Sequence, residues 1–156
     1  MIQQFLRDHD FHDLMVLHIR EIIDLLLAKG VYFSILTNIS EITFDPVLPA
    51  EITENFKPIT LFVIAEYTFE TASFDEENLY FEAGFGHQNI GSYLTIPLHA
   101  IVQIIVEDTP IMINLSVPPE HVPKKADVEK STNIFLSNPE NRDLLRKKKG
   151  KKTIKK

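Results

Sequence analysis

Apolar residues recur at helical spacing through the first thirty residues of the chain. The stripe is formed by Met15, Ile19, Ile22, Ile23 and Leu26. Acidic residues precede it, which suits the positive end of a helix dipole, and Lys29 suits the negative end. Gly30 supplies a residue that adopts the left-handed conformation after a helix. The pattern predicts a helix over about residues 10–29.

The predicted helix is apolar over more than half of its circumference, because Leu14, Leu17 and Leu25 lie outside the main stripe. Two arrangements fit this excess. One face packs on the chain's own sheet while the other packs on a second copy, or the whole helix is a core helix.

After Gly30 the hydrophobic period changes to that of extended chain. In the segment NLYFEAGFG, Leu79, Phe81, Ala83 and Phe85 share one face and polar or small residues the other. The segment between Thr43 and Lys57 shows no regular period, and a loop of this length is often functional. Strands are predicted over residues 31–38, 59–69, 78–86, 92–98, 99–107 and 109–118. The prediction is an α+β fold, mostly β, over residues 1–118.

The segment FEAGFGH contains two glycines. Gly84 and Gly86 remove side chains and so let another chain approach the backbone of the sheet closely. A β-bulge or bend explains the same two glycines equally well.

The pattern ends at Pro118, and residues 119–156 form a second part rich in Pro, Lys, Asn and Ser. We expect this tail to be disordered, because it has too few apolar residues to offset the entropy of ordering. Residues 1–123 carry 4 Lys and Arg against 18 acids, a net charge of −14, whereas residues 124–156 carry 12 against 4, a net charge of +8. We expect the acidic body to repel a nucleic-acid backbone and the tail alone to be able to attract one.

The sequence contains few residue patterns typical of catalytic or metal-binding sites. The chain has no cysteine, which excludes disulfides, thiolate metal sites and cysteine nucleophiles. Its five glycines form no phosphate-binding loop, and its histidines stand in no Ser/His/Asp pattern. His9 and His12, beside acidic residues, either hold a metal or mark a solvated helix start, and we favour the helix start. We expect no enzyme activity, no cofactor and no metal.

The first residues lack the pattern of a signal peptide, and the most apolar stretch is too short and too charged to cross a bilayer. The expectation is a cytoplasmic protein.

Taken in order, three segments resemble the stringent starvation protein B (SspB) family, adaptors that deliver tagged proteins to the ClpXP protease. They are VYFSILTN, FDPVLPAEITENFKPITLFVIAEYTF and FEAGFGHQNIGSYLTIPLHAIVQI, and a tail with a short C-terminal motif follows them. The resemblance covers about residues 12–118 and is strongest from Thr60 to Ile105.

The resemblance implies an Sm-like, partly open β-barrel or sandwich that forms a homodimer through its N-terminal helix, with contacts from Met15, Ile19, Ile22, Ile23 and Leu26. It implies a groove for an extended, ssrA-type degradation tag. The expected groove residues are Ile64, Glu66, Phe81, Ala83, Phe85, Gly86 and His87. The tail is expected to dock on the ClpX N-terminal domain through Leu144, Leu145, Arg146 and Lys147 or through Thr153, Ile154, Lys155 and Lys156.

The chain departs from the family pattern where relatives often carry a basic or polar residue at Gly84 and a second glycine at His87. A rival hypothesis is an Sm-like, nucleic-acid-associated protein whose basic tail binds phosphates. Deleting residues 141–156 would then abolish a salt-sensitive interaction.

Overall fold

A computed structural model describes residues 1–117 of the chain. The expected disorder of the tail lies outside these residues. So do the expected docking residues Leu144, Leu145, Arg146, Lys147, Thr153, Ile154, Lys155 and Lys156.

The long helix predicted from the apolar stripe is confirmed. After a short helix α1 (Ile2–Leu6), helix α2 spans His9–Lys29. The carboxylate of Asp8 accepts hydrogen bonds from the backbone N–H groups of Asp10 (2.9 Å) and Phe11 (3.1 Å), which caps the first turn. Gly30 ends the helix in the left-handed conformation with φ 70°.

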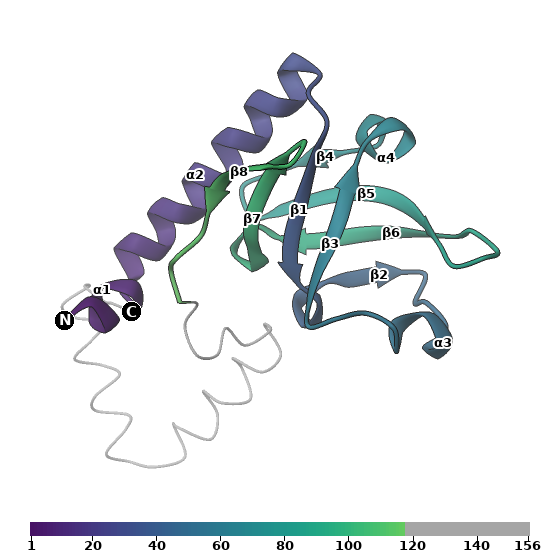
Figure 1. The fold of residues 1–156 in the computed structure, drawn as a ribbon, viewed down its shortest axis with the longest axis horizontal. Helices are drawn as coiled ribbons and strands as arrows, with labels where there is room; N and C mark the ends of the chain where they lie inside the picture. The colour runs from purple at the N-terminus through teal and green to yellow at the C-terminus, as the bar shows by residue number, and fades with distance from the viewer. Residues whose placement is uncertain (118–156) are drawn as a thin grey trace, which may run out of the picture. The chain divides into compact units, whose positions relative to one another are not determined.

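The strands form two four-stranded antiparallel sheets. The first has the order β3 (Ile59–Ile64), β1 (Phe33–Asn38), β7 (Ile101–Val106), β8 (Thr109–Ile113). The second has the order β2 (Thr43–Asp45), β6 (Ile90–Pro97), β5 (Asn78–Phe85), β4 (Ser73–Phe74). Short helices α3 (Ala50–Thr53) and α4 (Glu66–Glu70) and the 3₁₀ turns η1 (Ile39–Glu41) and η2 (Leu98–Ala100) connect them. Strands β1 and β3 run across the direction of β5 and β6 (Figure 1). The predicted α+β fold is confirmed. Helix and strand are present in about equal amounts rather than mostly as strand, and the two open sheets do not close into a barrel.

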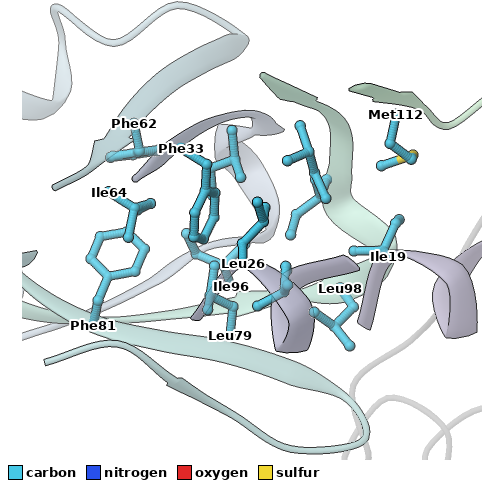
Figure 2. Close-up of a cluster of buried hydrophobic side chains, with 14 of the residues drawn as sticks. Ile19, Leu26, Phe33, Phe62, Ile64, Leu79, Phe81, Ile96, Leu98 and Met112 are labelled. Carbon is cyan, nitrogen blue, oxygen red and sulfur yellow. The ribbon is translucent and has the colours of Figure 1, made fainter. Parts of the chain in front are cut away.

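The core lies between the two sheets and helix α2. Phe81 of β5 points toward Ile64 of β3 at one end of the core, and Ile19 of α2 lies near Met112 of β8 at the other (Figure 2). Phe81, Ile64 and Ile19 are each 0% exposed. Burying side chains of this size contributes roughly 1.5–3 kcal/mol each.

Two connections differ from the sequence prediction. The strand expected over residues 59–69 ends at Ile64, because Ala65 is followed by Glu66 at φ 52°, which turns the chain into α4. The segment between Thr43 and Lys57 is not irregular throughout, since it contains β2 and α3.

The helix residues expected at a dimer interface line the chain's own core. Ile19, Ile23 and Leu26 are buried, and Met15 and Ile22 are half-buried against the same cluster. The assignment of Ile19, Ile23 and Leu26 to a contact with a second copy is therefore corrected, whereas that of Met15 and Ile22 stays a prediction. The large apolar side chains that α2 leaves exposed are Leu14, Leu17 and Leu25.

Within residues 1–117, no helix combines the length and the apolar character needed to cross a membrane.

Candidate functional site

A groove of about 620 Å³ crosses the end of the β5–β6 hairpin, with the start of α4 on one side and the end of β2 on the other. Two of the predicted binding residues, Glu66 and Ala83, line it. The full lining is Asp45, Pro46, Ala65, Glu66, Tyr67, Thr68, Glu82, Ala83, Gly84, Asn89, Gly91, Ser92 and Tyr93.

The floor of the groove is formed by the outward-facing positions of β5 and of its partner strand β6. Leu79 and Phe81 face the core, so Glu82 and Gly84 face outward. In the register with β6, Glu82 lies opposite Tyr93 and Gly84 opposite Gly91. The glycine pair leaves this part of the floor without side chains of its own.

The two facing glycines differ in their surroundings. A Cβ built on Gly91 meets nothing within 4 Å, so this position opens directly into free space. A Cβ on Gly84 would coincide with the side-chain amide oxygen of Asn89, which covers that glycine. Only glycine therefore lets the Asn89 side chain lie over β5.

The backbone edge of β5 is open within the groove. Strand β4 pairs only with Leu79 and Tyr80 of β5. Further along, the N–H of Glu82 donates to the hydroxyl of Thr71 at 3.0 Å. Residues two apart in a strand direct their N–H and C=O groups to the same side, so those of Gly84 point to this same edge, beyond the end of β4.

Helix α4 forms the wall beside that edge. The Tyr67 hydroxyl donates to the Glu82 carboxylate at 2.7 Å and so joins the wall to the floor. This hydrogen bond to the carboxylate raises the pKa of Tyr67 above its usual value, which keeps the phenol protonated as the donor. Glu66 holds a left-handed conformation that is uncommon for a residue with a side chain.

A second tyrosine is held in place on the floor. The ring of Tyr93 stacks on that of Tyr80, with centroids 6.0 Å apart and planes 14° apart. The Tyr80 hydroxyl in turn donates to the Asp75 carboxylate at 2.6 Å, which lowers the pKa of Asp75 and raises that of Tyr80. Tyr93 is 41% exposed, so its ring remains accessible from the groove.

The charged side chains that line the groove are all acidic, namely Asp45, Glu66 and Glu82. Neither Lys nor Arg is among the lining residues. Within residues 1–117, the contact between a basic and an acidic side chain lies elsewhere, where Nε2 of His99 is 3.4 Å from Oε1 of Glu41. The groove therefore presents negative charge that no basic side chain of the described part of the chain neutralises.

The structure separates the predicted binding residues. Ile64 and Phe81 are 0% exposed in the core, so a ligand in the groove cannot touch their side chains. Phe85 faces inward, its ring centroid 5.8 Å from that of Phe44 and 6.0 Å from that of Phe56. Gly86 and His87 are exposed in the hairpin turn, outside the groove's lining. The predicted contact of a ligand with the side chains of Ile64 and Phe81 is therefore corrected, whereas the assignment of Phe85, Gly86 and His87 stays a prediction.

Sequence reasoning missed Tyr67, Glu82, Asn89 and Tyr93. The alternation along residues 78–86 already placed Glu82 on the outward face, so its exposure could have been predicted from the sequence. Tyr67 had none, because the chain appeared extended through residue 69.

The groove offers groups that can hold a ligand. It combines an open strand edge, two positioned tyrosines and three carboxylates, with Ser92 occupied as a donor to the carbonyl of Pro46 at 2.9 Å. Within residues 1–117, no three His, Cys, Asp or Glu side chains are placed to hold a metal ion. No protein-family model matches the chain, and a search of curated proteins finds no match.

Proposed function

We propose that the chain is a cytoplasmic adaptor that performs no chemistry of its own. It binds the ssrA-type degradation tag of a client in the groove between α4 and the β5–β6 hairpin and is tethered to ClpXP through residues 119–156. The observation that supports this best is the open edge of β5 at Gly84, inside a groove large enough for several side chains.

An extended peptide fits such an edge by adding a strand to the sheet. Main-chain hydrogen bonds then supply affinity, and pockets for alternate side chains supply specificity. The N–H and C=O of Gly84 offer the main-chain pair on the α4 side of β5. Gly91 lies on the other side, on β6, where it leaves room on the floor for a side chain of the added peptide.

The tail completes the function by multivalency. A weak contact at the groove and a weak contact at the protease, both made by the same chain, raise the effective concentration of the client at the protease. The resemblance to SspB adaptors assigns the second contact to the ClpX N-terminal domain. Delivery then needs both parts of the chain, whereas tag binding needs only the first.

A homodimer suits this proposal, with the contact moved to the other side of α2. Leu14, Leu17 and Leu25 are 58%, 42% and 54% exposed and lie away from the core. A second copy that covered them would remove that apolar surface from water.

Deleting residues 119–156 is expected to abolish delivery without changing tag binding, because the groove is formed entirely by residues 45–93. Tag binding is measured by fluorescence anisotropy of a labelled ssrA-type peptide, and delivery by the rate at which ClpXP degrades a tagged substrate. The control replaces the tail by a Gly/Ser segment of equal length, which restores the linker but not the docking residues. Loss of peptide affinity on deletion, or full delivery without the tail, would contradict the division of labour.

The rival function, phosphate binding by the tail, is favoured by the charge of +8 on residues 124–156. It predicts binding to single-stranded nucleic acid whose affinity falls steeply with salt concentration. Measuring the salt slope with and without residues 141–156 separates the two functions.

A further inference from the structure

We propose that the groove selects a client segment that carries a lysine or arginine side chain, which enters between Tyr67, Tyr93 and the three carboxylates. This inference rests on the proposed function and names the class of peptide that the same site takes. It is carried by the combination, in one place, of a groove, aromatic side chains and carboxylates that no basic side chain among residues 1–117 neutralises.

The position of the carboxylates in the fold is the first argument. Asp45 lies opposite Tyr93 in the register of β2 with β6, and Tyr93 lies opposite Glu82 in the register of β6 with β5. Asp45 and Glu82 therefore flank the Tyr93 ring on three adjacent strands, on one face of the sheet. Glu66 joins them from the wall formed by α4.

The aromatic rings are the second and independent argument. Tyr67 and Tyr93 both line the groove and are 59% and 41% exposed. Tyr67 is held by the hydrogen bond of its hydroxyl to Glu82, and Tyr93 is held by the stacking of one face of its ring on Tyr80. The face of a tyrosine ring attracts ammonium and guanidinium groups, and positioned rings lose little entropy when one binds.

The charges that line the groove disfavour a peptide with an acidic side chain at this position. An acidic side chain at this point would meet three like charges with no Lys or Arg among the lining residues. Repulsion between like charges in a binding site lowers the affinity for a partner that carries them. The chain therefore differs from an adaptor whose groove takes an acidic tag.

The test is a binding series with the full-length chain. Labelled ssrA-type peptides are compared in which each position in turn is Lys, Ala or Glu, using fluorescence anisotropy. We expect one register at which Lys binds about tenfold tighter than Glu, a difference of about 1.4 kcal/mol. The preference should shrink as NaCl rises from about 0.1 M to about 1 M, because the screening length falls from about 10 Å to about 3 Å.

Two charge-matched variants locate the preference. The triple substitution Asp45→Asn, Glu66→Gln, Glu82→Gln is expected to remove the discrimination between Lys and Glu while the Ala peptide still binds. The control, Glu21→Gln, Asp24→Asn, Glu51→Gln, removes the same net charge from exposed positions outside the groove and should keep the discrimination.

The outcomes distinguish this inference from the function on which it rests. Equal binding of the Lys and Glu peptides, or tighter binding of the Glu peptide, overturns the cation preference while peptide binding itself stands. A preference that the control variant also removes reflects the net charge of the body and equally overturns it. Absence of binding by every peptide overturns both.

Discussion

Among single residues, His12 links the start of α2 to the end of the described chain. Its Nδ1 lies 3.4 Å from the hydroxyl of Ser116, and its ring centroid is 6.0 Å from that of His99. Burial is the main cause that lowers the pKa of His12 below 6.5, and the neighbouring His99 adds to it, while Asp13 acts in the opposite direction.

The lowered pKa predicts that His12 destabilises the fold in acid. The unfolded chain takes up a proton at pH about 6.5, before the folded chain does, so stability is retained above that pH and falls as the pH decreases through it. The decrease in melting temperature between about pH 7.5 and about pH 5.5 should therefore be smaller in His12→Gln than in the unsubstituted chain.

His18→Gln is the control for this prediction, because His18 is an exposed histidine on the same helix. It should leave the decrease unchanged. An equal decrease in His12→Gln and in the unsubstituted chain would assign the pH response to other groups.

At the scale of elements, substitutions in β3 test whether one face of this strand packs against the second sheet. Its side chains alternate between the core and the outer face, so that Ile64 is 0% exposed and Val63 is 59% exposed. Ile64→Ala is expected to lower the free energy of unfolding by about 2–5 kcal/mol, because it removes buried methylene groups and leaves a cavity. Val63→Ala should cost less than about 1 kcal/mol.

Urea denaturation of the two variants measures both values. Costs of similar size would mean that β3 does not bury one face against the second sheet.

The sequence predicted the elements whose signals are local. Helix α2 has a capping Asp8, a long apolar stripe and a closing Gly30, and β5 alternates over its whole length. Strands β2 and β4 were missed because three- and two-residue strands are too short to show a period. Helix α4 was missed because the chain turns into it at Glu66, which has a left-handed backbone conformation. Glutamate rarely adopts this conformation, so the turn could not be predicted from the sequence.

At the scale of the whole molecule, the groove draws on four separate segments, which is why only part of it was predictable. Glu66 and Ala83 were expected from the resemblance, and Gly84 from its effect on backbone access. Asp45 and Tyr93 join them only through the pairing of β2, β5 and β6, and pairing partners cannot be read from separate strands. Ile64 and Phe81 were assigned to the ligand because a buried and a binding apolar residue look alike in sequence.

The central claim is that a peptide pairs with the edge of β5 at Gly84 and extends a side chain over Gly91, and filling the groove tests it most directly. Gly91→Phe places a ring where a Cβ meets nothing within 4 Å, so the fold should tolerate it. Thr43→Phe is the control, on an exposed position of the same sheet outside the groove. The measurement is the affinity of full-length protein for a labelled ssrA-type peptide, with melting temperatures compared for all three proteins. We predict at least a roughly tenfold loss of affinity for Gly91→Phe and none for Thr43→Phe. Unchanged affinity in a folded Gly91→Phe protein would contradict the account.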